Sequence, residues 1–269
     1  MKIRVLVDNN TYIDAYYLAE PAACYYIEID GSKILFDTGY SHILLSNAAK
    51  MNVDLEKISH IVLSHGHNDH TGGLLYLHEK MDCSAIKLIA HRDCFLPKKM
   101  GQQSIGSPFL EKEIKKYFDY CPQEGVFHLS ENCIFLGEIP QSNDFELREE
   151  MGEVQRQGIW QRDILKEDTA LVCKTKQGLF IVTGCSHSGI CNIIEYAKRV
   201  CKEQKIAGVL GGFHIFEQGQ RLDKTIDYFV KNHITLLYPC HCVGFEAKAK
   251  IHQAIAIKEV GVGCSIVLY

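Results

Sequence analysis

A run of potential metal ligands between residues 64 and 73 constrains this chain more than any other stretch. It reads Ser-His-Gly-His-Asn-Asp-His-Thr-Gly-Gly and follows a short apolar run. His65 and His67 are one residue apart, so an extended or looped backbone can direct both imidazoles to one side. Asp69 and His70 add a carboxylate and a third imidazole. The alternative is a polar loop with solvent-facing histidines, but these ligands together suit catalytic zinc, or iron or manganese less selectively.

Length, charge and hydropathy exclude several classes of protein. A chain of 269 residues with 46% hydrophobic content can bury a large core in one layered α/β domain. The net charge of −4, without a basic run, argues against nucleic acid as a partner. No stretch of about 18 uninterrupted apolar residues predicts a membrane span. The N-terminal residues resemble a short strand and not a signal peptide. We therefore expect a cytoplasmic protein that acts on a small molecule.

The cysteine content predicts reduced thiols. Twelve cysteines in a chain of this size, without an export signal, do not indicate a disulfide framework. Most lack CxxC spacing, so a dedicated cysteine-zinc site is not expected. Cys185, Cys240 and Cys242 differ from the others because each lies close to a candidate histidine ligand.

Histidines follow several of the predicted buried strands. From residue 169 onward, short β-favouring runs alternate with helical patterns. Five strand candidates are each followed closely by a histidine: Leu63 by His65, Ala90 by His91, Thr183 by His187, Leu210 by His214 and Tyr238 by His241. Parallel strands bring their carboxyl ends to one edge of a sheet, where ligands gather. If the last three strands run parallel, their histidines share that edge, which predicts a metal site built from distant segments.

The segment from about 94 to 167 lacks clear periodicity. It contains prolines, glycines and a charged run, and it is predicted to be an insertion within a single domain spanning residues 1–269. Long irregular segments in compact domains often form lids or binding loops, although a flexible surface excursion fits equally well. Arg148, Arg156, Trp160 and Arg162 are candidate contacts for an anionic or ring-shaped substrate, and solvated side chains are the commoner explanation.

Several motifs of the chain resemble those of one protein family. The stretch His65-Gly66-His67-Asn68-Asp69-His70 resembles the HxHxDH signature of the metallo-β-lactamase-fold superfamily, and Phe36-Asp37-Thr38-Gly39 resembles its strand-ending aspartate motif. Residues 183–189, 211–214 and 239–242 are similar to a branch of metal-dependent hydrolases that includes dihydropterin-ribofuranosyl-aminobenzene-phosphate synthases of methanopterin biosynthesis. The resemblance implies a four-layer αββα fold, in which two mixed sheets are sandwiched between helices.

The resemblance also implies two metals, predicted to be zinc. The first would be held by His65, His67 and His187. The second would be held by Asp69, His70 and His241. The superfamily usually has a bridging aspartate after a glycine, where this chain has Gly184-Cys185, so Cys185 or Asp168 is expected to take part of that role. Asp37 is expected to orient a ligand through its second imidazole nitrogen.

The predicted chemistry depends on the metal. Bound zinc lowers the pKa of its water to about 7 and polarises the oxygen under attack. Asp69 could orient the water or accept its proton, and His214 could protonate the leaving group or contact the substrate. His214 as a ligand or a structural histidine, and His91 as a weaker candidate, remain alternatives.

Three function classes follow. The first is a metal-dependent hydrolase of a small ester, phosphoester or related substrate, with anionic compounds among the candidates. The second is a synthase or transferase acting on a pterin-like or phosphoribosyl-like compound, which rests on the narrower resemblance alone. The third is a di-iron redox protein. It is disfavoured because His67 stands where redox members carry a carboxylate and no flavin-binding domain follows. The oligomeric state is not predicted.

Overall fold

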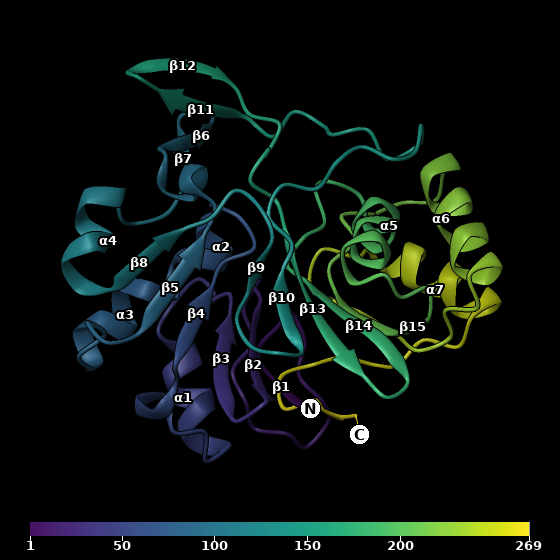
Figure 1. The fold of residues 1–269 in the computed structure, drawn as a ribbon, viewed down its shortest axis with the longest axis horizontal. Coiled ribbons are helices and arrows are strands. Elements are labelled where there is room, and N and C mark those ends of the chain that lie inside the picture. The colour runs from purple at the N-terminus through teal and green to yellow at the C-terminus, as the bar shows by residue number, and fades with distance from the viewer. Residues whose placement is uncertain (269) are drawn as a thin grey trace.

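Two facing sheets form the centre of the molecule, with helices on the outer face of each (Figure 1). The computed structural model describes residues 1–268. The first sheet has the strand order β17-β1-β2-β3-β4-β5-β8. Its strands are β1 (Lys2–Val7), β2 (Cys24–Ile29), β3 (Ser32–Phe36), β4 (His60–Val62), β5 (Lys87–Ala90), β8 (Asp119–Pro122) and β17 (Ser265–Val267). The helices α1 (Ile43–Lys50), α3 (Gly73–Lys80) and α4 (Glu111–Tyr117) bury side chains against its outer face.

The second sheet has the order β16-β15-β14-β13-β10-β9. Its strands are β9 (Phe127–His128), β10 (Cys133–Phe135), β13 (Ala170–Thr175), β14 (Gly178–Thr183), β15 (Ile206–Gly211) and β16 (Leu237–Pro239). The helices on its outer face are α5 (Ile190–Cys201), α6 (Gln220–Lys231) and α7 (Phe245–Ala254). Both sheets mix parallel and antiparallel neighbours.

The alternation of side chains along each strand explains the layers. In β14, Leu179 and Ile181 pack against the outer helices, whereas Phe180 and Val182 pack between the sheets. Successive strand residues point to opposite faces, so a strand that is apolar on both faces must be covered on both sides. Residues of the first sheet such as Phe36 complete the core between the sheets. The predicted four-layer α/β fold is confirmed.

The local elements predicted along the first half also form. Asp30 and Gly31 connect β2 to β3 with φ values of 52° and 76°, which is the left-handed geometry of a tight hairpin turn. The predicted helix after residue 42 is α1, and the predicted parallel arrangement of β14, β15 and β16 is present. Among residues 1–268, no helix has the length and apolar character needed to cross a bilayer.

The segment 94–167 is only partly outside the two sheets. β8 extends the first sheet, β9 and β10 extend the second, and α4 contributes to the outer core. The remainder forms a small third sheet of β6 (Lys98–Met100), β7 (Gln103–Ser104), β11 (Glu153–Arg156) and β12 (Ile159–Arg162). The hairpin of β11 and β12 projects from the main body at the top of Figure 1. These strands have two to four residues each, too few to show periodicity. Parts of the segment 94–167 thus belong to the two main sheets, and the remaining strands form the third sheet.

Candidate metal centre

Three strand ends deliver the candidate ligands to one place. His65 and His67 follow β4, and Asp69 and His70 lie on the short helix α2 (Asn68–Thr71) that comes next. Cys185 and His187 follow β14, and His241 follows β16. The convergence predicted from the chain order is thus present for His65, His187 and His241. It arises because β14, β15 and β16 are parallel and face the sheet that carries β4.

The first group of donors consists of imidazoles. His65 Nε2 lies 3.1 Å from His67 Nδ1. The ring of His187 lies 4.9 Å from that of His65 and 5.3 Å from that of His67, measured between centroids. The donor atoms of His65, His187 and Cys185 all lie within 4.8 Å of one another. His65, His67 and Asp69 also offer donor atoms within 4.8 Å of one another, so His65 belongs to both sets and links His67 to His187.

The second group combines oxygen, nitrogen and sulfur. One donor atom each from Asp69, His70, Cys185 and His241 lies within 4.8 Å of the others. His70 Nε2 is 3.2 Å from Cys185 Sγ, and Asp69 Oδ2 is 3.3 Å from His241 Nε2. Cys185 belongs to both groups, so its thiol stands where the superfamily's aspartate was expected.

Asp168, the other residue expected at that position, is not among the donors. Its Oδ2 accepts hydrogen bonds from the Ser188 backbone N–H at 2.9 Å and from the Ser188 hydroxyl at 2.5 Å. Asp168 therefore holds the loop that carries His187. His91 also lies outside both groups, because its Nε2 is 3.1 Å from Glu138 and its Nδ1 accepts from the Asp93 N–H.

Three imidazole nitrogens of the site make no hydrogen bond among the described residues. His67 Nε2, His187 Nε2 and His241 Nε2 are buried and make no hydrogen bond among the described residues. Buried polar atoms are nearly always paired, so orphaned nitrogens beside Asp69 and Cys185 indicate a missing ligand. Neutral imidazole, carboxylate and thiolate are together suited to zinc. The residues present therefore fit the implied metals.

Outer contacts fix the orientation of the imidazoles. Asp37 Oδ2 lies 2.7 Å from His70 Nδ1 and accepts from the Ser64 hydroxyl at 2.8 Å. Asn9 Oδ1 is 3.1 Å from His241 Nδ1. Ligating histidines commonly use their second nitrogen in this way. Asp37 therefore lies where the sequence predicted.

Replacing Asp37 with asparagine is expected to weaken metal binding about 10- to 100-fold while leaving the fold intact. The amide is isosteric but lacks the charge that favours the His70 N–H tautomer, and calorimetric titration of the metal-free protein measures the change. Asp30→Asn is the matched control, since Asp30 also has a positive φ and accepts hydrogen bonds, but on the far hairpin. Equal affinity in Asp37→Asn and wild type would contradict the assigned role.

Backbone strain marks the same region. Asp37, Ser186, His214 and His241 have φ values of 57°, 60°, 48° and 51°. Non-glycine residues rarely adopt this left-handed region, and those that do gather at functional sites, where surrounding contacts hold them. At His241 those contacts include the Asp8 carboxylate, which accepts the backbone N–H at 3.0 Å.

Burial keeps the first group of imidazoles neutral. It lowers the pKa of His65 and His187 well below the usual value, and the neighbouring imidazoles lower it further. Burial lowers the pKa of His67 to about 4. A metal binds the neutral ring, so these histidines are ready to ligate without losing a proton at neutral pH.

Asp69 and His70, in contrast, stabilise each other's charged forms. Burial alone would raise the pKa of Asp69, but His70 and His241 outweigh it and hold that pKa well below its usual range. Burial would lower the pKa of His70, but Asp69 and Asp37 raise it well above its usual value. In the metal-free protein, the carboxylates of Asp69 and Asp37 therefore favour the protonated form of His70.

The metal-free protein is expected to lose stability as the pH falls from about 6.5 toward 4. The folded pKa of His67 lies below the value near 6.5 of an unfolded chain, so the unfolded state binds more protons in that window. The lowered pKa of His67 alone accounts for about 2–4 kcal/mol of the free energy of unfolding, which is present above pH 6.5 and is lost as the pH falls toward 4. Urea unfolding with a chelator at several pH values measures this. His67→Gln should flatten the profile, and an unchanged profile would contradict the assignment.

Two residues beside the ligands complete the site. The His214 ring lies 4.3 Å from that of His187, between centroids, and is partly exposed. Cys242 is buried, and its thiol approaches the Cys185 carbonyl oxygen at 3.5 Å. One donor atom each from Cys185, His214 and Cys242 lies within 4.8 Å of the others. The sequence singled out Cys242 only for its place beside His241, and no local pattern predicted this contact.

The proposed substrate-binding side chains of the 94–167 segment have partners within the protein. Arg148 donates to the Ile139 carbonyl at 3.1 Å, and Arg156 pairs with Asp93. Arg162 pairs with Glu150 at 2.7 Å, and Lys99 lies 4.4 Å above the Trp160 ring. Solvated or structural roles fit these contacts better than substrate binding.

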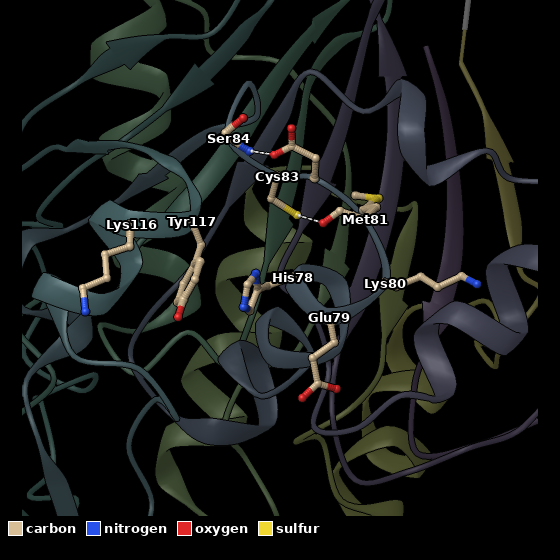
Figure 2. Close-up of a pocket in the computed structure, with 9 residues that line it drawn as sticks. His78, Glu79, Lys80, Met81, Cys83, Ser84, Lys116 and Tyr117 are labelled. Atoms are coloured by element: carbon tan, nitrogen blue, oxygen red, sulfur yellow. Dashed lines mark hydrogen bonds between the residues drawn. The ribbon is translucent and has the colours of Figure 1, made fainter.

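A separate surface cavity of about 450 Å³ lies between α3 and α4 (Figure 2). His78 and Tyr117 stack within it at 3.6 Å between centroids, and the Cys83 thiol donates to the Met81 carbonyl. In the described part of the chain, none of its lining residues belongs to a group with metal-ligand spacing. The chemistry therefore concentrates at the sheet edge.

Comparison with known proteins supports this assignment. A family model described as the metallo-beta-lactamase superfamily matches residues 18–127. An uncharacterised protein of Methanocaldococcus jannaschii is 36% identical over 256 residues, covering 93% of this chain and 94% of the relative. A second protein of that archaeon, 7,8-dihydropterin-6-methyl-4-(beta-D-ribofuranosyl)-aminobenzene-5'-phosphate synthase, is 27% identical over 263 residues, covering 92% and 89%.

Solved structures give the same result. The crystal structure of Tm1679, described as a metal-dependent hydrolase of the beta-lactamase superfamily, superposes with a TM-score of 0.84 at 28% identity, covering 100% of this chain and 99% of the other. A diphosphatase from the PhnP family superposes with a TM-score of 0.59 at 13% identity, covering 100% and 98%, and shows likeness of fold alone. Fold, ligand pattern and relatives agree: the chain belongs to the metallo-beta-lactamase superfamily.

Proposed function

We propose that this protein is a metal-dependent hydrolase with two zinc ions, acting on a small ester, phosphoester or related substrate. The observation that carries the proposal is the pair of donor groups joined at Cys185, with three buried histidine nitrogens that make no hydrogen bond among residues 1–268. The similarity to Tm1679 supports the hydrolase class. Iron or manganese would suit the imidazoles and the carboxylate, but the Cys185 thiolate favours zinc.

His65, His67 and His187 would hold the first ion. Asp69, His70, Cys185 and His241 would hold the second. Metals bound there would lower the pKa of a water molecule and polarise the substrate oxygen. Three protein ligands at the first position leave a coordination place open, as catalytic sites require.

The chain's own residues orient the reactants. The Asp69 side chain is 27% exposed, so it can face the opening while its Oδ2 stays beside His70 and His241. We assign it to hold the attacking water and accept its proton. His214 is partly exposed beside His187, and a ring N–H there can donate to the leaving-group oxygen.

A synthase or transferase acting on a pterin-like or phosphoribosyl-like compound is the second candidate. It is favoured by the 27% identity to the dihydropterin synthase over nearly the whole chain. The same metals could activate a substrate for group transfer in place of hydrolysis. Analysis of products separates the two, because hydrolysis consumes water and incorporates its oxygen, whereas transfer leaves the acceptor modified.

The first test is elemental analysis of protein purified without added metal. We expect about two or more zinc per chain, followed by a screen of ester and phosphoester substrates in oxygen-18 water. His67→Ala should lose the ion at the first position. A protein that binds no metal even after reconstitution would refute the proposed centre.

A further inference from the structure

A third set of donor atoms lies beside the two already described. It consists of Cys185, His214 and Cys242, with one donor atom from each within 4.8 Å of the other two. Both thiols are nearly inaccessible, at 4% and 9% exposure. The proposed hydrolytic reaction gives Cys242 no role, so its placement against Cys185 and His214 needs a separate explanation.

The fold brings His214 and Cys242 to the same face. They lie in the loops that follow the parallel strands β15 and β16, and these loops are joined by a parallel bridge between Ile215 and Val243. The Gly244 N–H donates to the Ile215 carbonyl at 2.9 Å and secures the bridge. His214 and Cys242 each directly precede a bridge partner, so the bridge brings the two residues close together.

The position of each donor is fixed by its neighbours. A Cβ atom at Gly212 would lie 2.3 Å from Cys242 Sγ, so the thiol occupies the space that the missing side chain leaves. His214 holds a φ of 48°, and its ring packs on His187 and Phe216 at 4.3 and 4.9 Å between centroids. The three donors are therefore held in place before any ligand binds.

Their chemistry selects a thiophilic ion. His214 Nδ1 is buried and makes no hydrogen bond among residues 1–268. Two cysteines and one histidine form a known catalytic zinc set in proteins, with a fourth position open to water or substrate. Soft thiolates favour zinc over harder divalent cations such as magnesium, and binding displaces the thiol protons.

We propose that Cys185, His214 and Cys242 hold a third metal ion, of the thiophilic class that includes Zn²⁺, with Cys185 shared with the neighbouring centre. An imidazole has two nitrogens, so His214 can ligate through one and present the other to the substrate. This site does not require the protein to be a hydrolase, since it depends only on these three residues.

Cobalt titration of the metal-free, reduced protein tests the proposal. Co²⁺ occupies zinc sites, and thiolate-to-cobalt absorption in the near ultraviolet grows with the number of thiolates bound. We expect wild type to bind one equivalent more than Cys242→Ser, whose near-ultraviolet absorption should fall to about half because Cys185 remains. Cys83→Ser is the matched control, since the Cys83 thiol also contacts a backbone carbonyl but lies in the cavity of Figure 2.

Equal cobalt stoichiometry and equal absorption in wild type and Cys242→Ser would overturn the third site. If circular dichroism shows that Cys242→Ser is misfolded, His214→Ala is titrated in its place. His214→Ala keeps both thiols and should bind one cobalt equivalent fewer than wild type. If it binds as much cobalt as wild type, the proposal is overturned. His67→Ala separates the two hypotheses: it should lose the ion of the first histidine group but keep the thiolate absorption. If His67→Ala binds as much cobalt as wild type, the two-metal centre is refuted and the third site is not.

Discussion

Lys98→Met is expected to destabilise the protein by about 3–5 kcal/mol, the usual cost of removing one partner from a buried ion pair. The Lys98 ammonium has no exposed surface and lies 2.5 Å from Asp163 and 2.7 Å from Glu167, both also buried. Burial would lower the pKa of Lys98, but the two carboxylates raise it, so the group stays charged. Methionine retains the apolar stem and leaves two carboxylates in the interior without a cation.

Urea unfolding measures the loss, and removal of the two unpaired carboxylates identifies the cause. Adding Asp163→Asn and Glu167→Gln should recover much of the stability.

Lys99→Met is the matched control for Lys98→Met. Lys99 is the next residue on β6, but it is 31% exposed and pairs with Glu153 at 3.3 Å. Exposed pairs contribute about 0–1 kcal/mol, so a small change is expected. Similar destabilisation in both variants would show that the buried charge of Lys98 is not the cause.

The second large effect is expected for His187→Ala, which should release the ion of the first group and reduce turnover at least about 10³-fold. A catalytic metal supplies several kcal/mol of transition-state stabilisation, and each 1.36 kcal/mol is a factor of ten. Elemental analysis and turnover of the best substrate from the screen measure the two effects. Folding should persist, because the His187 side chain packs on other ligands and not in the apolar cores.

His91→Ala is the control for His187→Ala. His91 also follows a buried strand, but its ring lies beside Glu138, in a set with Glu124 that shares no residue with the donor groups of the centre. Metal content at the centre and turnover should be unchanged. A His187→Ala protein with full metal content and activity would show that this histidine is not a ligand.

Local sequence signals were sufficient for much of the fold. The hairpin at Asp30-Gly31, the strands β2 and β14, and the helix α5 follow from turn chemistry and periodicity within about ten residues. The histidines behind the parallel strands also predicted that distant segments would share one sheet edge, and His187 lies beside His214 there. Such features depend on neighbouring residues, which the sequence displays directly.

Other features depended on contacts between distant segments. The short strands β8 and β10 carry little periodicity, and the sheets that receive them decide their place. In the sequence, Lys98 resembles an ordinary surface lysine. The fold places it between Asp163 and Glu167, about 65 residues away. No local pattern distinguishes a buried cation from a solvated one.

The sequence by itself determined the superfamily, the layered fold and most of the candidate ligands, because each is encoded in a short motif or a repeated spacing. Only the tertiary structure decided that Cys185 and not Asp168 joins the donor groups, that His91 stays apart, and that Cys242 meets His214. The physical reason is that a ligand set is defined by distances of a few ångströms between side chains, and those distances are set by how whole sheets pack together.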